Sequence, residues 1–402
     1  MNAAFMPGPA ALREVPLGRA ARALWTLRED ASLLNHGARG AVPRVVQQEQ
    51  ERLRAGMERH PDAFFARIEP SGTERAPRAV AAAIARMVGT SGERIALVEN
   101  ATSGVQAVLD SLPFGQGDAI LVTELQYNAV RLAVEARCRE TGATPLVVRL
   151  PLPLDEDTVV ERVLDAAGPQ VKLALLDHIS SGTAMRLPLE RIAPELRRRG
   201  IPVFIDGAHA VGQIPLDLDA LPVDWYVGNL HKWGYAPRGS ALLYAAPGAA
   251  SLTRPLLVSH YIGQGFPHSF DYTGSRDYTA WLAIPRALAF REELGVQRVR
   301  AYCADLVLAG STALQRIGAR PVAPLAADLA MRAFLLPQVR PATDADAAVV
   351  TRELWNQARI QVRCARQGSA LLLRFCAQAY VEADELAALA AAMDRLGWPA
   401  RQ

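Results

Sequence analysis

The sequence predicts an α/β protein that has a mainly parallel sheet in a large domain and a smaller second domain. Up to about residue 277, short apolar runs alternate with segments of helical period, as in parallel strands joined by right-handed crossovers. One apolar run, residues 202–205, leads directly into Asp206, and open α/β sheets bind ligands at the carboxyl ends of their strands. From Tyr278 onward the pattern changes to long helices.

These elements divide the chain into three parts. Residues 1–32 are expected to form an N-terminal arm that contributes to the small domain, residues 33–277 the large domain, and residues 278–402 the small C-terminal domain. The large domain is predicted to contain strands at residues 95–98, 119–123, 145–149, 171–176, 202–205, 225–227 and 241–245, and helices at 43–58, 77–88, 105–111, 130–139 and 157–166. The small domain is predicted to contain helices at 281–293, 296–316 and 383–396 and strands at 333–336, 361–364 and 371–375.

The composition favours a soluble, cytoplasmic protein. A net charge of +3 over 402 residues gives no support for binding to nucleic acid or to a membrane surface. No run of about 18 apolar residues is present to span a bilayer, and the N-terminal residues lack the apolar core of a signal peptide. The four cysteines show neither a disulfide framework nor metal-type spacing, so no metal site is expected.

Lysine is rare in this chain, which makes its occurrence at residue 232 informative. Only Lys172 and Lys232 are lysines, and the other 42 of the 44 basic residues are arginines. Arginine stays charged and does not act as an amine nucleophile, whereas lysine can lose its proton and form a Schiff base. Lys232 together with Asp206 would supply what pyridoxal phosphate needs, namely a covalent amine partner and a carboxylate for the pyridinium nitrogen. The alternative is a surface lysine and an aspartate that caps a helix.

Two motifs around these residues resemble a known family. They are D-x-A-H-x-x-G at residues 206–212 and H-K-W-x-x-A-P-R-G at residues 231–239. In both motifs, and over most of its length, the chain is similar to the class V aminotransferase family of fold-type I pyridoxal phosphate enzymes. Within that family it most resembles isopenicillin N epimerase-like proteins and the C–S lyases of ergothioneine synthesis. The resemblance implies a seven-stranded type of sheet flanked by helices, and a smaller C-terminal α/β domain.

The resemblance also implies a phosphate site near residue 102. Small hydroxyl residues and a glycine, N-A-T-S-G at residues 100–104, precede a predicted helix. The N-terminus of a helix binds anions through its N–H groups and its dipole. We therefore expect Thr102 and Ser103 to contact the cofactor phosphate, although either residue could instead simply cap the helix.

Further cofactor contacts are expected from residues that match the family pattern. Tyr127 matches the position whose ring stacks on the pyridine, and one of Ser180 and Ser181 matches a residue that contacts the ring substituents. His209, three residues after Asp206, is placed to reach the phenolic oxygen. The remaining expected cofactor contacts are Asn229 and His231.

A long irregular segment, residues 254–277, suggests a shared active site. Such segments in compact proteins are usually functional or lie at interfaces. The family has G-T-x-D here, which binds the phosphate of the partner subunit's cofactor, and this chain has the corresponding Gly274-Ser275-Arg276-Asp277. Because serine keeps the hydroxyl group, Ser275 is expected to take this role in a homodimer with shared sites.

The substrate is expected to be an amino acid. Arg374, which follows an apolar strand, resembles the family arginine that holds the substrate carboxylate through its two-pronged guanidinium group. Asn35 and His36 match the family's L-N-H-G loop on the substrate side of the cofactor. Departures from the pattern are Arg39 for an aromatic residue, Cys376 for a serine and Val381 for an asparagine.

Three reactions at Cα remain open, and each begins with removal of the Cα proton by Lys232. β-Elimination of a sulfur group needs only this one base, so a C–S lyase is favoured. Epimerisation needs a second acid, for which Tyr127 or a loop histidine is a candidate, and transamination needs reprotonation at the cofactor. Cys364 lies a few positions before the place of a desulfurase nucleophile, which disfavours that activity. A non-catalytic scaffold is disfavoured because Lys232, Asp206 and Arg374 are all present.

Overall fold

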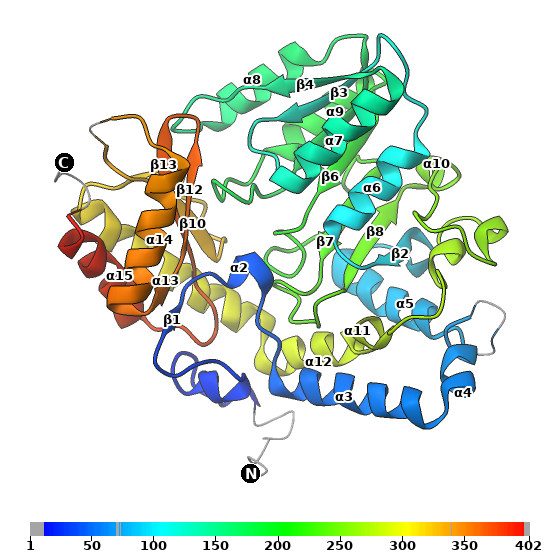
Figure 1. The fold of residues 1–402 in the computed structure, drawn as a ribbon, viewed down its shortest axis with the longest axis horizontal. Helices are drawn as coiled ribbons and strands as arrows, with labels where there is room; N and C mark the ends of the chain where they lie inside the picture. The colour runs from blue at the N-terminus through cyan, green and yellow to red at the C-terminus, as the bar shows by residue number, and fades with distance from the viewer. Residues whose placement is uncertain (1–11, 70–71, 73, 339, 398–402) are drawn as a thin grey trace. The chain divides into compact units, whose positions relative to one another are not determined.

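The computed structural model describes residues 12–69, 72, 74–338 and 340–397 and separates them into two compact units (Figure 1). The large unit comprises residues 47–181 and 185–285, and the small unit comprises the described parts of residues 1–46, 182–184 and 286–402. Residues 33–46, which the sequence places in the large domain, group with the small unit. The reason is a pairing that joins distant parts of the chain, since β1 (Ser32–Leu33) lies parallel to β11 (Ile360–Gln361).

A seven-stranded sheet forms the centre of the large unit, in the order β2-β8-β7-β6-β5-β3-β4. β8 runs antiparallel to both of its neighbours, and the other adjacent pairs are parallel. The predicted α/β fold with a mainly parallel sheet is therefore confirmed. The strands are β2 (Ile95–Val98), β3 (Ala119–Thr123), β4 (Thr144–Val148), β5 (Val171–Asp177), β6 (Val203–Asp206), β7 (Trp225–Asn229) and β8 (Ala241–Ala245).

Helices cover both faces of this sheet. Helices α6 (Ala101–Ser111) and α7 (Asn128–Thr141) connect β2 to β3 and β3 to β4, so the chain moves along the sheet toward its β4 edge. Helices α8 (Glu156–Ala166) and α9 (Leu189–Arg198) connect β4 to β5 and β5 to β6, so the chain moves back in the opposite direction. Because parallel crossovers are right-handed, the first pair covers one face and the second pair the other. The other helical segments of this unit are α3 (Arg44–Arg59), α4 (Pro61–Ala66), α5 (Ala76–Val88), η2 (Gly92–Arg94), α10 (Pro247–Ala250), η3 (Ile262–Gln264), η4 (His268–Phe270) and α11 (Thr279–Leu282). Helix α12 (Ile284–Leu294) belongs to the small unit except for its first two residues.

A glycine allows α6 to lie directly on the sheet. A Cβ atom at Gly104 would lie 2.6 Å from Cγ2 of Val227 on β7, closer than carbon atoms approach without displacement. The N-terminus of α6 is therefore held next to the carboxyl end of β7, the side on which an α/β sheet binds ligands.

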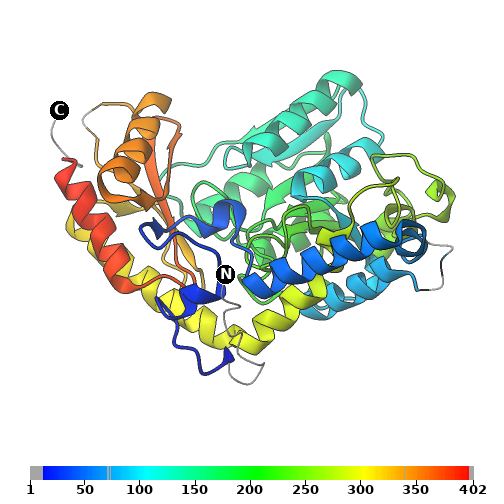
Figure 2. The same cartoon turned by 60° about the horizontal axis from the view of Figure 1, so that its bottom comes forward.

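The small unit contains a four-stranded antiparallel sheet in the order β12-β13-β10-β9. In both views the long helix α13 lies beside the C-terminal helix α15 (Figures 1 and 2). The elements of this unit are η1 (Ala21–Leu24), α2 (His36–Arg39), α13 (Val296–Arg316), β9 (Arg320–Pro321), β10 (Met331–Leu335), α14 (Asp344–Ala358), β12 (Arg363–Gln367), β13 (Ala370–Cys376) and α15 (Ala383–Arg395).

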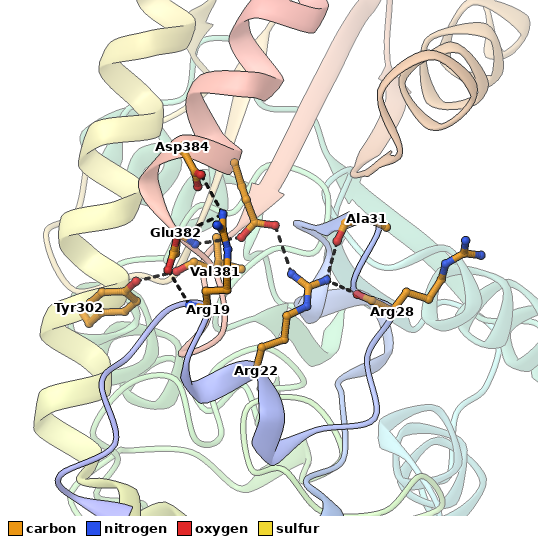
Figure 3. A network of polar contacts seen from close by, with 9 residues as sticks. Arg19, Arg22, Arg28, Ala31, Tyr302, Val381, Glu382 and Asp384 are labelled. Atoms are coloured by element: carbon orange, nitrogen blue, oxygen red, sulfur yellow. Dashed lines mark hydrogen bonds and ion pairs between the residues drawn. The ribbon is translucent and has the colours of Figure 1, made fainter.

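Charged side chains join the N-terminal segment to the start of α15 in a network that we call the N-terminal clamp (Figure 3). Arg22 donates hydrogen bonds to the backbone carbonyls of Arg28 and Ala31 and forms an ion pair with Glu385 at 3.5 Å. The residues of the clamp are Arg19, Arg22, Arg28, Ala31, Tyr302, Val381, Glu382, Asp384 and Glu385. Within the part of the chain that the structure describes, no helix has the length and apolar character needed to cross a membrane.

Candidate active site

The carboxyl ends of three neighbouring parallel strands bring polar side chains together in the large unit. Asp177 ends β5, Asp206 ends β6 and Asn229 ends β7. Asp206 is paired in register with Asp177 on one side and with Val227 on the other. All three polar side chains are buried, which is unusual for charged groups unless they serve a ligand or have partners.

Asp206 is a buried carboxylate beside a single cation. Its side chain is 3% exposed, and its Oδ1 accepts a hydrogen bond of 2.9 Å from the backbone N–H of Ala208. Burial raises the pKa of Asp206, while the Ala208 N–H and the Lys232 ammonium group act in the opposite direction. A positively charged ring nitrogen at this carboxylate would favour the ionised form in the same way as Lys232 does.

Lys232 is held in a tight loop between β7 and β8. Backbone hydrogen bonds from Leu230 to Ser240 and from Ala236 to Leu230 close this loop. Gly212, with φ of +86°, lets a neighbouring turn approach, because a Cβ there would lie 2.6 Å from the backbone of Trp233. The side chain of Lys232 is buried, whereas that of Lys172, the other lysine, is 58% exposed. The alternative of a surface lysine therefore does not apply to Lys232.

His209 contacts the amine of Lys232. The distance from Lys232 Nζ to His209 Nε2 is 3.2 Å, and both side chains are buried. His231, the residue before Lys232, is kept neutral because burial and the Lys232 ammonium group lower its pKa to about 4. The predicted contact of His209 with the phenolic oxygen of the cofactor stays a prediction.

The residues of the predicted anion site lie at the N-terminus of α6. The structure starts this helix at Ala101, four residues earlier than the sequence predicts, so Thr102 and Ser103 lie in its first turn and do not cap it. The cap is Asn100, whose Oδ1 accepts from the N–H of Ser103 at 2.9 Å. Asn229 from β7 accepts from the N–H of Ala101 at 2.9 Å and so fixes the helix end against the sheet.

The other predicted cofactor residues lie around these strand ends. Tyr127 precedes α7 and is 44% exposed, so its ring is available to a ligand or a partner. Ser180 and Ser181 follow β5 and are buried, and the Oγ of Ser180 donates to the carbonyl of Leu125 at 3.4 Å.

Ser275 lies on the surface of the large unit. It is exposed, and its hydroxyl is 3.1 Å from the hydroxyl of Tyr272. The next residue, Arg276, fixes the loop, because its guanidinium group lies 4.3 Å from the ring centroid of Tyr278 and 4.2 Å from that of Trp281. Ser275 is therefore an exposed residue on a loop whose next residue packs against two aromatic rings.

The three predicted substrate residues lie together within the small unit. Arg374 is 1% exposed, and its Nη2 donates to Oδ1 of Asn35 at 2.7 Å. The Nδ1 atom of His36 lies 2.9 Å from the hydroxyl of Tyr380, so His36 does not bond only its own backbone. Cys376 accepts a weak hydrogen bond from the N–H of Gly37 at 3.4 Å, so the thiol at this position still bonds the loop.

Sequence reasoning missed Asp177 and its neighbour Gln126. Asp177 is 2% exposed, and its Oδ1 accepts from Nε2 of Gln126 at 3.4 Å. The signal was present, because the run L-A-L-L-D at residues 173–177 repeats the pattern of an apolar strand that ends in aspartate, as in V-F-I-D at residues 203–206.

This combination of fold and site agrees with sequence comparison. A sequence profile of the aminotransferase class-V family matches residues 68–370. The chain therefore belongs to the class-V aminotransferase family, a family of enzymes that use pyridoxal phosphate.

Its relatives include two kinds of enzyme. The chain is 33% identical over 383 residues to isopenicillin N epimerase of Streptomyces clavuligerus, and the alignment covers 90% of this chain and 94% of that enzyme. It is 33% identical over 287 residues to putative L-cysteine desulfhydrase 1 of Oryza sativa subsp. japonica, covering 66% of this chain and 59% of that protein. A solved cystine C–S lyase has the same fold, with a TM-score of 0.78 at 21% identity and coverage of 90% and 97% of the two chains.

The residues of the large unit fit pyridoxal phosphate. A phosphate matches the N-terminus of α6, and a pyridinium nitrogen matches the buried carboxylate of Asp206. An aldehyde matches the amine of Lys232, which is buried and lies next to a histidine. Each of the three groups of the cofactor thus has a residue of complementary chemistry.

Proposed function

We propose that this protein is a pyridoxal phosphate-dependent C–S lyase that removes a sulfur leaving group from Cβ of a cysteine-derived amino acid, such as a cysteine conjugate sulfoxide. The observation that carries the proposal is the pairing of one buried amine, Lys232, with His209 at 3.2 Å. β-Elimination requires one base at Cα and a leaving group, and Lys232 is that base. Desulfhydrases among the relatives support a reaction of this class.

The roles of the residues follow from their positions. The cofactor, when bound, supplies the electron sink that stabilises the charge left by loss of the Cα proton. Asp206 holds the charge of the ring nitrogen, and Lys232 accepts the Cα proton. Arg374, oriented by Asn35 at 2.7 Å, binds the substrate carboxylate. Thr102 and Ser103 hold the phosphate at the start of α6.

The cysteines argue against a desulfurase. A desulfurase needs a reactive thiolate, and the thiol of Cys364 has its pKa raised to about 12 by burial. Among the described cysteines, Cys138, Cys303 and Cys376 are buried and only Cys364 is partly accessible. We therefore do not expect Cys364 to accept sulfur from the substrate as a persulfide.

The test is to incubate the protein with cysteine sulfoxide conjugates and pyridoxal phosphate and to assay pyruvate. Pyruvate should form in the wild type and be absent with Lys232→Ala. Exchange of the Cα proton with deuterium, without pyruvate and with inversion, would reject the lyase.

Epimerisation is the second candidate. The specific observation in its favour is that isopenicillin N epimerase matches 90% of this chain, compared with 66% for the desulfhydrase. Epimerisation needs a second acid, and Tyr127, half-exposed at the start of α7, is the candidate in the large unit. Replacing Tyr127 with Phe would abolish epimerisation but leave elimination. Formation of a new amino acid from an added 2-oxo acid would instead indicate transamination.

We further propose that the protein is a cytoplasmic homodimer with shared sites. An exposed apolar run, Leu256–Leu257–Val258, lies on the irregular segment that carries Ser275, and Val258 is 82% exposed. A second copy that covers this run would bring Ser275 to the partner's phosphate. Mixing subunits of Lys232→Ala with subunits of Ser275→Asp tests this, because only trans action gives each mixed dimer one intact site. If activity does not return in mixed dimers while sedimentation shows that they form, Ser275 does not act across the interface.

A further inference from the structure

We propose that Asp177 is a second acidic residue of the cofactor site, which holds a proton and leaves Asp206 as the single carboxylate that faces the ring nitrogen. Asp177 is a positioning residue, since it acts on the charge of Asp206. The proposal rests on the pyridoxal phosphate site and does not depend on whether the reaction is elimination or epimerisation.

The sheet places the two carboxyl groups side by side. Asp177 and Asp206 are register partners on the adjacent parallel strands β5 and β6, and register partners project to the same face of a sheet. The two side chains are 2% and 3% exposed. Two acids are thus held in neighbouring positions where water does not reach them.

One negative charge is what this environment supports. Two carboxylates that share a buried site do not both ionise, because the repulsion between them is only weakly screened. Lys232, from the loop after β7, is the cation that acts on both acids. Among the described neighbours, Gln126 is an amide, and His178 is kept neutral because burial lowers its pKa to about 3. Burial and the charge of Asp206 raise the pKa of Tyr226, so it stays protonated, and the guanidinium group of Arg186 acts on His178 and Tyr226.

Hydrogen bonds decide which acid carries the charge. Asp206 accepts a backbone N–H at 2.9 Å, a bond that favours its ionised form. Asp177 accepts only the long bond of 3.4 Å from Gln126, and its Oδ2 has no hydrogen-bond partner among the residues that the structure describes. A carboxylate oxygen left this way in a dry site is costly, whereas a neutral acid group is tolerated. In agreement, burial and the charge of Asp206 raise the pKa of Asp177 well above its ordinary value.

A proton on Asp177 keeps the negative charge next to the cofactor ring equal to the positive charge of its nitrogen. A single carboxylate next to a single pyridinium leaves no net charge there. If Asp177 were also ionised, the extra negative charge would raise the pKa of every protonated group around it, including the nitrogen of Lys232.

Infrared difference spectroscopy tests the proton directly. The carbonyl stretch of a protonated acid should be present in the wild type at neutral pH and missing in Asp177→Asn. Because burial also raises the pKa of Asp271, a spectrum of Asp271→Asn is the control that assigns the band. In Asp206→Asn, which removes the like charge, the band of Asp177 should disappear at a lower pH than in the wild type. A wild type without a band that depends on Asp177 would overturn the proposal. The measurement works on protein with or without the cofactor, so a failure to bind pyridoxal phosphate would count against the proposed function alone.

A double-mutant cycle on cofactor affinity separates the charge role from a packing role. In the wild-type background, Asp177→Asn replaces one neutral group by another, and the dissociation constant of pyridoxal phosphate should change less than about twofold. In the Asp206→Asn background, Asp177 has lost its charged neighbour and can ionise in its place, so removing it should weaken binding about tenfold further. A purely structural residue would give the same change in both backgrounds, and this outcome would also reject the proposal. If Asp177→Asn does not fold, the infrared titration of the wild type and Asp206→Asn remains sufficient.

Discussion

At the scale of residues, the proposed chemistry depends on a single lysine, whose surroundings differ from those of the other lysine. Lys172 is 58% exposed and lies 4.0 Å from Asp118, as an ordinary surface cation does. Lys232 is buried and contacts a histidine. The sequence identified Lys232 from its rarity and its motif, but the contact with His209 depends on two loops that meet only in the folded protein.

Replacing Lys232 with Arg should separate charge from nucleophilicity. The guanidinium group keeps the positive charge beside His209 but does not form the covalent linkage with the cofactor. The visible absorption of the lysine-bound cofactor should be lost, and turnover should fall at least about 1,000-fold. Lys172→Arg is the matched control and should behave as the wild type. Turnover close to that of the wild type in Lys232→Arg would show that another group is the base.

The buried His178 should make the protein sensitive to acid. Burial lowers its pKa from 6.5 to about 3 in the folded protein, while the unfolded chain keeps the ordinary value. As the pH falls through this range, the unfolded chain takes up a proton that the folded protein does not, so the free energy of unfolding decreases. At about pH 4.5 the loss should be about 2.5 kcal/mol relative to neutral pH.

Urea unfolding of wild type and His178→Asn at both pH values measures this effect. Asparagine retains a group that can bond the hydroxyl of Tyr226, which His178 Nδ1 contacts at 3.0 Å, but it does not titrate. The variant should therefore lose less stability between neutral and acid pH. Equal losses in the two proteins would show that other groups cause the acid sensitivity.

At the scale of elements, the strands were more predictable than the helix ends. The predicted strands at residues 95–98, 119–123 and 241–245 coincide with β2, β3 and β8, because a buried strand is a continuous apolar run. The start of α6 was misplaced because Asn100, the actual cap, precedes small residues without helical period. Helix α9 was not predicted, and Pro194 inside it is a residue that normally interrupts helices.

Pairing between distant segments was not predictable from local pattern. One strand was expected at residues 361–364, whereas the structure has two, β11 and β12. The first of these pairs with β1, more than three hundred residues earlier in the chain. In the same way, Asp177 at the end of β5 could not be recognised as a neighbour of Asp206 until the strand register was known.

The N-terminal clamp yields a prediction about the attachment of an element. Arg22 and its partner Glu385 have side chains that are 13% and 12% exposed. Arg22→Ala leaves a largely buried carboxylate without its cation and removes the bonds to two backbone carbonyls, so it should lower the free energy of unfolding by about 3 kcal/mol.

Arg19 offers the matched control within the same clamp. It pairs with Asp384 at 3.0 Å, but its side chain is 71% exposed, and exposed ion pairs contribute little. Arg19→Ala should therefore cost less than about 1 kcal/mol. Thermal unfolding of the two variants is the measurement, and equal effects would show that the clamp does not depend on burial.

At the scale of the whole molecule, described segments that precede and follow the large unit in the sequence build the small unit together. Trp25, from the N-terminal segment, is 1% exposed and packs edge-on against Phe290 and Tyr380, with ring centroids 5.6 and 5.1 Å away. The sequence predicted that the N-terminal arm contributes to the small domain, but it could not show which side chain forms the contact.

Trp25→Ala should test this assembly. Removal of a buried tryptophan costs about 3–5 kcal/mol, and the small unit should become sensitive to limited proteolysis at a lower temperature than in the wild type. The seven-stranded sheet of the large unit contains none of these contacts, so proteolytic fragments of that unit should appear unchanged. Uniform digestion of both units would show that they unfold as one.

Because the small unit is built from segments on both sides of the large unit, its parts are not synthesised at the same time. The large unit is complete once Pro285 has been synthesised, and domains generally fold as units as they emerge. Trp25 and Arg22, which precede the large unit in the chain, have to remain without these neighbours until Tyr380 and Glu385, which follow it, have been synthesised. The segment around Trp25 thus stays unpacked while the whole of the large unit is made.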